Sequence, residues 1–370
     1  MVCVRGGTRV MAASIPQPTD RCIHEGGFRA AAAGAACRDF PGPVKCGLSP
    51  AGPTGRATAT SESYPTSPHH SVADDSPHVG NNPTTKRGPV VSLENQRPTI
   101  EELEDKARVL RRHIIEMTTE AGSGHPTSSL SATEVVTAIY FGGFLNYNAD
   151  EPDWTERDRF IMSKGHAVPA LYAAMAEAGY FPVEDLATLR KLGSPLEGHP
   201  NVRRLAGIEA STGSLGQGLS VGLGQALGCR IDGHDSRVFV VMGDGEMGEG
   251  QVWEAIATAH KYQVGNLTAI VDQNGYQQTG ATSDVLDLTP FAPKIESFGW
   301  HVQTINGNDM SEVVSALETA VGITDRPTAI VAETQKGFGI LPVLEEAGDM
   351  NFHGQALPAE VAEKALAHLG

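Results

Sequence analysis

The stretch VVMGDGEMGEG, residues 240–250, runs a series of apolar residues directly into Gly-Asp-Gly. The preceding RVFVVMG is a short β-branched run, typical of a strand that is buried in a parallel sheet. A second apolar run, LTAIVD at 267–272, ends two residues before a lone Asn274. The two runs therefore predict two strands, each followed by a polar side chain close to its carboxyl end.

The segments that follow alternate between helical and strand patterns. Helices are expected at 249–262, 290–298 and 310–321, and strands at 301–306 and 328–334. Repeated strand–helix–strand units predict an α/β fold, a parallel sheet flanked by helices on both faces. Ligands bind such sheets at the carboxyl ends of the strands. Gly243-Asp244-Gly245 and Asn274 are expected at this edge.

The folded part begins with helices. TIEE predicts a capping box, with Thr99 as N-cap and Glu102 three residues later. The first helix should end before AGSGHP, where two glycines and a proline interrupt it. Further helices are expected at 132–141, 168–178 and 214–229. The last is rich in Gly and Ala, so it must pack very closely against a neighbour.

A carboxylate and a carboxamide at two neighbouring strand ends can both face one hard cation. Mg²⁺ prefers oxygen ligands and often shares them with phosphate oxygens. The glycines beside Asp244 allow the backbone to approach a ligand, and a helix N-terminus beyond them favours an anion. The pair with Asn274 therefore indicates a metal-bridged diphosphate. Two alternatives stay open: ordinary strand-end turns, and a dinucleotide fingerprint, whose acidic residue at a second strand end is missing.

Gly-Asp-Gly followed after about thirty residues by Asn resembles the thiamine diphosphate motif, and the resemblance extends over residues 95–356 to the N-terminal, diphosphate-binding domain of transketolase. Five segments, the last of which contains Gly-Asp-Gly, fall in the order and spacing of that family: GSGHPTSSLS (122–131), SKGHAVPALY (163–172), LEGHPN (196–201), STGSLGQGLS (211–220) and GDGEMGEGQVWEA (243–255). The resemblance implies thiamine diphosphate and Mg²⁺ as cofactors, with Ca²⁺ or Mn²⁺ as alternative ions. It implies that Asp244, Asn274 and the backbone carbonyl of Tyr276 bind the metal.

Histidines recur in these motifs. His125, His166 and His199 each follow a glycine where a loop is expected to meet a helix. A flexible backbone beside an imidazole indicates a side chain that points into a cleft, and imidazoles suit proton transfer near neutral pH. The resemblance implies that His125, His199 and His353 line the substrate channel and act in catalysis. It also implies that His166 contacts the cofactor's diphosphate.

The resemblance assigns roles to further residues. Those expected to bind the cofactor, besides the residues named above, are Gly213, Ser214, Leu215, Gly243, Gly245 and Glu246. Glu249 and Glu254 follow Gly-Asp-Gly, and in the family glutamates at such positions link two active sites across a subunit interface. An acidic first helical turn is the simpler interpretation, but it fits Glu254 less well, because Glu254 lies deeper in the expected helix beside Trp253. Lys336, in TQKGFG, fits either a site residue or an exposed turn lysine.

Composition restricts the remaining function classes. The chain has 370 residues, with 28 Lys and Arg against 44 Asp and Glu, so a nucleic-acid or anionic membrane surface is not expected as its main partner. No apolar run is long enough to span a membrane. Four of five cysteines lie in the first fifty residues, and Cys229 alone cannot form a disulfide within the main domain. We therefore expect a cytoplasmic protein.

Residues 1–90 differ from the remainder. They are rich in Gly, Ala, Pro, Ser and Thr, lack apolar periodicity, and hold nine basic and six acidic residues. Residues 91–370 hold 19 basic and 38 acidic residues. We expect 1–90 to be a disordered or non-native extension, with a transit peptide as the alternative, and 91–370 to be the transketolase-like domain.

Full-length transketolases carry two domains beyond the one that this chain resembles. In that family the middle domain, the first of these two, supplies a glutamate that activates the cofactor and most groups that hold the sugar phosphate. The resemblance therefore implies the N-terminal subunit of a split transketolase, active only with a C-terminal partner subunit, in an α₂β₂ assembly. Its reaction would transfer a two-carbon ketol unit from a ketose phosphate to an aldose phosphate.

Other functions stay open. The same chemistry could serve an unusual sugar, such as a sulfosugar or a natural-product intermediate. A 2-oxo acid dehydrogenase subunit fits the Gly-His motifs less well, and a non-catalytic scaffold would not be expected to keep Asp244, Asn274 and the histidines. The run GYQQTG after the Asn departs from the Ile-Ser-Ile-Asp-like run of many relatives. A carbonyl ligand tolerates this change, but the side-chain contact with the thiazolium ring is placed in doubt.

Overall fold

The computed structural model describes residues 97–278 and 280–370. The expected extension, residues 1–90, and the four cysteines in it lie outside the described part. The fold begins with α1 (Ile100–Glu120), α2 (Pro126–Leu130), α3 (Thr133–Phe141), β1 (Arg159–Met162), η1 (Gly165–Ala167), α4 (Val168–Glu177), η2 (Val183–Thr188) and α5 (Gln217–Asp232). It continues with β2 (Val238–Gly243), η3 (Gly245–Gly248), α6 (Gly250–Lys261), β3 (Leu267–Gln273), α7 (Thr282–Val285), α8 (Phe291–Ser297), β4 (His301–Asn306), α9 (Met310–Gly322), β5 (Thr328–Glu333), α10 (Leu341–Ala347) and α11 (Ala359–Leu369).

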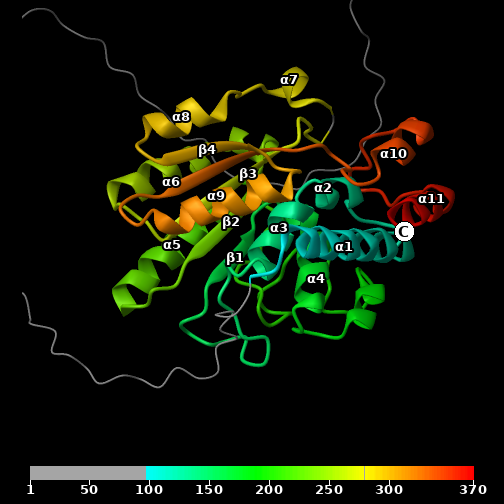
Figure 1. The fold of residues 1–370 in the computed structure, drawn as a ribbon, viewed down its shortest axis with the longest axis horizontal. Helices are drawn as coiled ribbons and strands as arrows, with labels where there is room; N and C mark the ends of the chain where they lie inside the picture. Colours follow the sequence, from blue (N-terminus) through cyan, green and yellow to red (C-terminus); the bar gives the residue numbers. More distant parts are fainter. Residues whose placement is uncertain (1–96, 279) are drawn as a thin grey trace, which may run out of the picture. The chain divides into compact units, whose positions relative to one another are not determined.

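The five strands form one parallel sheet in the order β1-β2-β3-β5-β4 (Figure 1). The expected parallel α/β fold is confirmed. β2 and β3 are neighbours, and their register pairs Gly243 with Asp272. The residues that follow these two strands therefore start from the same edge of the sheet. This register is what brings Asp244 next to the turn that holds Asn274.

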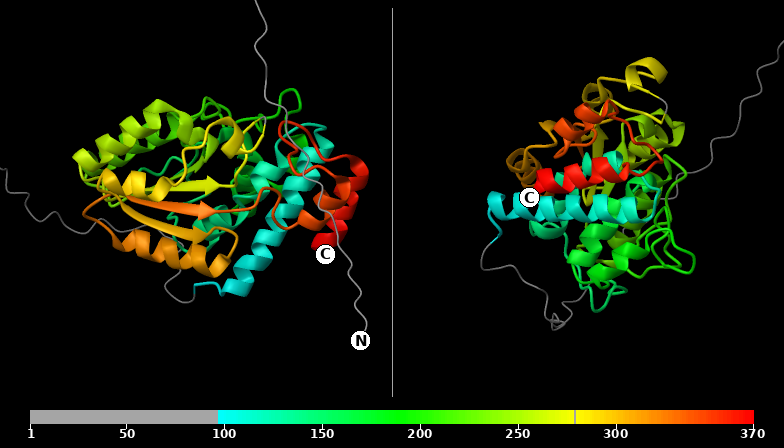
Figure 2. Two further views of the ribbon diagram at one scale, coloured as in Figure 1. Left: turned by 90° about the horizontal axis from the view of Figure 1, so that it is seen from above. Right: turned by 90° about the vertical axis from the view of Figure 1, so that its right-hand side faces the viewer.

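Both faces of the sheet are covered by helices (Figure 2). On β2, Phe239 and Val241 belong to a core shared with α1, α3, α4 and α9. Val238, Val240 and Met242 alternate with them and belong to a second core shared with α5, α6 and α8. Successive side chains of a strand point to opposite faces, and every residue of β2 is buried. This explains why β2 is apolar throughout.

Helix α5 packs against the sheet at van der Waals distance, as its Gly and Ala content predicts. A Cβ atom on Gly222 would lie 2.6 Å from Val240 Cγ2, and one on Gly218 would lie 2.4 Å from Ser163 Cβ. On the other side of the helix, a Cβ on Gly224 would meet nothing within 4 Å. Only one face of α5 therefore requires glycine for packing within the described residues.

Most expected elements are present, with shifted ends. The capping box of Thr99 and Glu102 forms as predicted. Helix α5 begins at Gln217 instead of 214, because Gly216 takes a left-handed conformation with φ 80°. Helix α6 begins at Gly250, after the 3₁₀ turn η3. The sequence interpretation missed β1, which has only four residues beside a charged segment, and it also missed α10 and α11.

Candidate functional site

Asp244 lies directly beyond β2, at the start of η3. Its side chain is nearly buried, and its two oxygens accept hydrogen bonds from backbone N–H groups: Oδ1 from Gly245 at 2.8 Å and Oδ2 from Gly275 at 2.7 Å. Burial, together with the charge of Asp272, raises the pKa of Asp244 to about 6, although the two backbone donors oppose the shift. Among residues 97–278 and 280–370, no lysine or arginine forms an ion pair with this carboxylate.

Asn274 follows β3 and faces the same edge. Its Nδ2 donates to Asp272 Oδ2 at 3.1 Å, and its Oδ1 accepts from Tyr276 N at 3.1 Å. Gly275 lies between them and donates to Asp244 Oδ2. One hydrogen bond therefore joins Tyr276 to Asn274 within their turn, and a second one, from Gly275, joins that turn to Asp244. The structure brings all three together.

A buried ion pair lies beneath this turn. Lys164 and Asp272 are at most 1% exposed, and Lys164 Nζ donates to Asp272 Oδ2. Lys164 Nζ also donates to the carbonyl of Ser128 at 2.9 Å. Burial alone would raise the pKa of Asp272, but the charge of Lys164 and the hydrogen bonds that the carboxylate accepts lower it. Asp272 is therefore a carboxylate neutralised from inside the protein.

Three of the predicted histidines form one cluster. The ring centroids of His125 and His353 are 4.7 Å apart, and His166 lies 5.0 Å from each of them. His125 precedes α2 and His166 lies in η1, so both occupy the expected loop–helix junctions. The Nδ1 atom of His125 is buried and has no hydrogen-bond partner in the part of the chain that the structure describes. A buried imidazole nitrogen without a partner indicates that a ligand or water completes the cluster.

The imidazoles of the cluster are held uncharged. Burial, followed by the charges of His353 and Arg190, lowers the pKa of His125 to about 3. Burial and then Lys336 lower the pKa of His353 to about 4. Burial also lowers the pKa of His166. At neutral pH each ring therefore offers one N–H donor and one nitrogen acceptor, a combination that suits hydroxyl groups.

Lys336 belongs to the same group of residues. It is 3% exposed, its Nζ lies 3.5 Å from His353 Nδ1, and it lies 5.7 Å from the ring centroid of Tyr276. Burial and the charge of Lys164 lower the pKa of Lys336 to about 8, although Asp272 and Asp244 oppose the shift. Of the two interpretations of Lys336, the structure contradicts the exposed turn lysine.

His199 and Gly213 lie close to each other. A Cβ on Gly213, whose φ is 133°, would lie 2.8 Å from His199 Cδ2. The expectation that His199 marks a loop–helix junction is wrong: it lies in an irregular segment between η2 and α5. Gly165 Cβ would lie 2.7 Å from Gly213 N, so the segment with Gly213 and Ser214 packs directly against the turn of His166. Leu215, which follows, is half-buried.

The three predicted glutamates differ in exposure. Glu246 is 2% exposed, and its carboxylate accepts from Ser163 Oγ, from Gly216 N at 2.8 Å and from Gly243 N at 3.1 Å. Burial raises the pKa of Glu246. Its oxygens are occupied by the protein, so it holds three loops together at the edge of the sheet. Glu249 and Glu254, at and beyond the start of α6, are exposed.

The chemistry of this edge is suited to anions and a hard cation. It combines one carboxylate without a cationic side chain, one carboxamide oxygen, two buried lysines and three uncharged imidazoles. Within residues 97–278 and 280–370, no group of three His, Cys, Asp or Glu is arranged to hold a metal. The predicted ligand set contains one carboxylate only, so this finding does not conflict with it.

Comparison with known proteins identifies the family of this chain. The family described as transketolase, thiamine diphosphate binding domain, matches residues 102–370. The chain belongs to this transketolase family. The resemblance seen in the motifs is thereby confirmed, and the family match extends to the last residue of the chain, beyond the segment 95–356 that the motifs indicated.

Similar proteins include both short and long transketolases. The 6-deoxy-6-sulfo-D-fructose transketolase subunit SqwG of a Clostridium species is 40% identical over 268 residues, which are 72% of this chain and 96% of that protein. Human transketolase is 41% identical over 268 residues, 72% of this chain but only 42% of its own length. The Campylobacter jejuni transketolase structure has a TM-score of 0.68 at 30% identity, over 74% of this chain and 43% of that one.

Two residues of this transketolase domain were missed by the sequence interpretation. Lys164 lies in SKGH, a motif singled out for its histidine, and Asp272 ends LTAIVD, a run assigned to a strand. A charged residue at the end of a fully apolar strand is a usable signal, because such a residue needs a partner when it is buried. The partner comes from 108 positions away in the sequence and could not be found by spacing.

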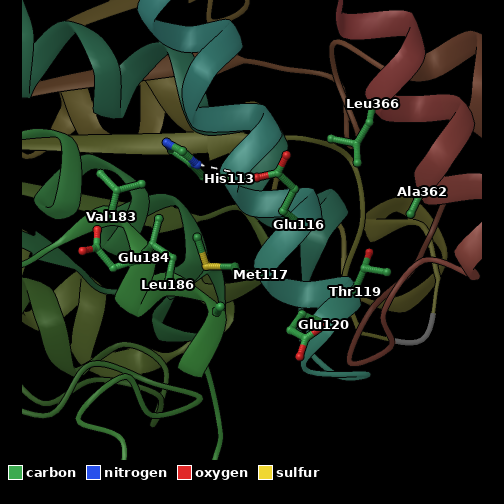
Figure 3. Close-up of a pocket in the computed structure, with 11 residues that line it drawn as sticks. His113, Glu116, Met117, Thr119, Glu120, Val183, Glu184, Leu186, Ala362 and Leu366 are labelled. Atoms are coloured by element: carbon green, nitrogen blue, oxygen red, sulfur yellow. Dashed lines mark ion pairs between the residues drawn. The ribbon is translucent and has the colours of Figure 1, made fainter.

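A hollow lies elsewhere on the domain, between α1, η2 and α11 (Figure 3). Its lining includes His113, Glu116, Met117, Leu186 and Leu366, and none of the predicted site residues. His113 Nε2 lies 2.8 Å from Glu177 Oε1. The chemistry at the sheet edge, and not the size of this hollow, locates the candidate site.

None of the helices in the described residues is long and apolar enough to cross a membrane.

Proposed function

We propose that this chain is the diphosphate-binding subunit of a thiamine-diphosphate-dependent transketolase. The observation that carries the proposal is the meeting of Asp244 and Asn274 at adjacent strand ends, where Gly275 donates to Asp244 Oδ2 at 2.7 Å. The reaction would transfer a two-carbon ketol unit from a ketose phosphate to an aldose phosphate. The family match supports the cofactor class.

The residues present fit a magnesium diphosphate. Asp244, the Asn274 oxygen and the Tyr276 carbonyl would hold Mg²⁺, with Ca²⁺ or Mn²⁺ as substitutes. Three protein oxygens leave the other positions of an octahedron for phosphate and water. A Cβ atom added to Gly213 or Gly245 would come within 2.8 Å of a neighbouring side chain. These two positions beside the proposed cofactor site therefore have no room for a residue larger than glycine.

Three histidines, two of them from the cluster, would act on the sugar. The bound cofactor supplies an electron sink at its thiazolium ring. His125, His199 and His353 would hydrogen-bond the sugar hydroxyls and move protons at the carbonyl and hydroxyl oxygens of the substrate. His166, Ser214 and Leu215 would contact the cofactor, together with Gly243 and Gly245. Lys336 would supply positive charge beside these groups.

A partner subunit would complete the enzyme. The relative that this chain covers almost entirely carries the word subunit in its name, and the chain spans 42% of the length of human transketolase. Glu249 and Glu254 are exposed at the start of α6, where an interface can bury them. We propose an α₂β₂ assembly with a C-terminal transketolase subunit, in which these glutamates face the partner and link two active sites.

The substrate divides the proposal into two candidates. The usual donor would be a ketose phosphate such as xylulose 5-phosphate. The second candidate is 6-deoxy-6-sulfo-D-fructose or a related sulfosugar, which the name of the Clostridium relative favours. Both donors carry a carbonyl beside a hydroxylated carbon, so the histidine cluster serves either.

The test combines the full chain with its candidate partner, thiamine diphosphate and Mg²⁺. Ketol transfer to ribose 5-phosphate is followed from xylulose 5-phosphate and from 6-deoxy-6-sulfo-D-fructose in parallel. Turnover that needs both chains supports the split enzyme, and the preferred donor decides between the two substrates. Cofactor binding without any ketol transfer would contradict the proposed activity.

A further inference from the structure

Asp272 collects hydrogen bonds from four side chains at the end of β3. Its Oδ2 accepts from Ser131 Oγ at 2.7 Å, from Lys164 Nζ, and from Asn274 Nδ2 at 3.1 Å, while Oδ1 accepts from Thr334 Oγ1. The carboxylate is fully buried. Its donors come from three other segments of the chain, so its position is determined from several directions.

The hydrogen bond between Asp272 and Asn274 determines the orientation of the Asn274 carboxamide, that is, which side its NH₂ group and its oxygen face. A carboxylate paired with a lysine can only accept hydrogen bonds. Asn274 must therefore turn its NH₂ group toward Asp272, and its oxygen lies on the opposite side. There Oδ1 accepts from Tyr276 N at 3.1 Å and keeps a second lone pair free for another partner.

The NH₂ end of an amide cannot bind a cation, so the orientation of Asn274 decides whether it can be a metal ligand. We propose that the Lys164–Asp272 pair is a positioning device that holds the Asn274 oxygen toward the divalent metal of the bound diphosphate cofactor. This inference rests on the proposed function and deepens it. Neither Lys164 nor Asp272 is a ligand in this account.

Lys164 and Asp272 also make hydrogen bonds to other residues at this edge of the sheet. Lys164 follows β1 and is fixed by the carbonyl of Ser128 at 2.9 Å. The backbone N–H of Asp244 donates to the carbonyl of Asp272 at 3.2 Å. Asp272 thus holds the Asn274 side chain through its carboxylate and the Asp244 backbone through its carbonyl.

The test removes the pair without leaving an isolated buried charge. Lys164→Met combined with Asp272→Leu replaces both charges by apolar groups of similar size, an exchange that is often neutral for stability. The matched control is Arg111→Met with Glu134→Leu, because this ion pair is also buried. The control pair has no hydrogen bond to Asn274 or Asp244.

Calorimetric titration of the full chain with thiamine diphosphate, repeated over a series of Mg²⁺ concentrations, gives the metal requirement. We expect the Lys164/Asp272 variant to need roughly 10–100-fold more Mg²⁺, the range found for residues that orient metal ligands. The control variant should match the wild type. Equal metal requirements in the two variants would overturn the positioning role and leave the proposed function standing, whereas no cofactor binding by the wild type, alone or with its candidate partner, would overturn both.

A second measurement is made on the wild-type chain, so it does not depend on how the two ion-pair variants fold. In wild-type chain labelled with ¹⁵N at Asn, the Asn274 side-chain amide, assigned by its loss in Asn274→Ala, should exchange its protons with water slowly, because Asp272 binds one of them. Free exchange at the rate of exposed asparagine amides would show that the orientation is not fixed, and would overturn the inference.

Discussion

Asp244 and Asp272 are the same residue type at neighbouring strand ends, yet their surroundings are opposite. Asp244 accepts hydrogen bonds from two backbone N–H groups, and burial with the charge of Asp272 raises its pKa to about 6. Asp272 accepts from Lys164 and three other side chains, and despite complete burial these partners lower its pKa.

The difference shows that two carboxylates at one edge of a sheet can have different roles, one structural and one in ligand binding. A buried carboxylate with its own cation is complete without a ligand, and its removal leaves an uncompensated charge. A buried carboxylate without a cationic side chain is electrostatically incomplete, and a metal ion can complete it. The contrast therefore predicts that the loss of Asp272 acts mainly on folding and only indirectly, through Asn274, on binding, whereas the loss of Asp244 acts on binding directly.

The largest expected effect is on stability. Asp272→Ala leaves Lys164 buried and unpaired, so the free energy of unfolding should fall by about 3–5 kcal/mol. Urea unfolding of the full chain, followed by circular dichroism, measures this loss. A fall below about 1 kcal/mol would remove the contrast, since a change of that size is typical of one ordinary hydrogen bond.

Asp244→Ala should show the reverse pattern. The two lost backbone hydrogen bonds are offset by relief from the charge of Asp272, so the free energy of unfolding should change by about 1 kcal/mol or less. Thiamine diphosphate affinity in the presence of Mg²⁺ should fall by more than about 100-fold. Loss of a direct metal ligand should cost more than loss of a residue that only orients a ligand, which typically costs about 10–100-fold. Unchanged affinity by calorimetry would assign Asp244 to an ordinary turn.

Two glycines of α5 form a second pair of like residues in different surroundings, because Gly222 packs against the sheet and Gly224 does not. Gly222→Ala should cost about 1–3 kcal/mol, because the new methyl group would lie 2.6 Å from Val240 Cγ2. Gly224→Ala, where the methyl group meets nothing within 4 Å, should stabilise the helix by about 0.5–1 kcal/mol. Thermal unfolding of both variants under one set of conditions tests the prediction, which fails if the two shift in the same direction.

The smallest effect concerns pH. His125 and His353 have pKa values of about 3 and 4 in the fold, below the ordinary value of 6.5. Below pH 6.5 the unfolded chain binds protons that the folded chain does not, so lowering the pH from 7 to 5 destabilises the fold. His125→Gln with His353→Gln should reduce the accompanying fall in melting temperature, on the order of 2–4 °C. An equal fall in wild type and variant would show that these rings titrate normally.

Local signals in the sequence predicted much of this account. The apolar strands, Gly-Asp-Gly, Asn274 and the Gly-His pairs depend on neighbours in the chain, and the structure brings Asp244, Asn274, His125, His166 and His353 to one edge. The sequence alone could not distinguish the role of Asp272 from that of Asp244, because both are aspartates at the ends of predicted strands.

What was missed depends on long-range partners. The role of Asp272 depends on Lys164, which is 108 positions away, and on Thr334, which lies beyond β5. The irregular setting of His199 was mispredicted for a related reason: its close neighbour is Gly213, and a preceding glycine says nothing about such a contact. Spacing within a motif identifies candidate residues, but their charge state and orientation are set by tertiary contacts.

The central claim is that Asp244 and Asn274 form half of a site that a divalent metal and a diphosphate complete. Calorimetric titration of the full wild-type chain with thiamine diphosphate, with Mg²⁺ present and after its removal by a chelator, tests this claim most directly. Binding that appears with Mg²⁺ and disappears without it is the predicted result. Binding of equal strength in both samples, or none in either even when the candidate partner subunit is added, would contradict the claim.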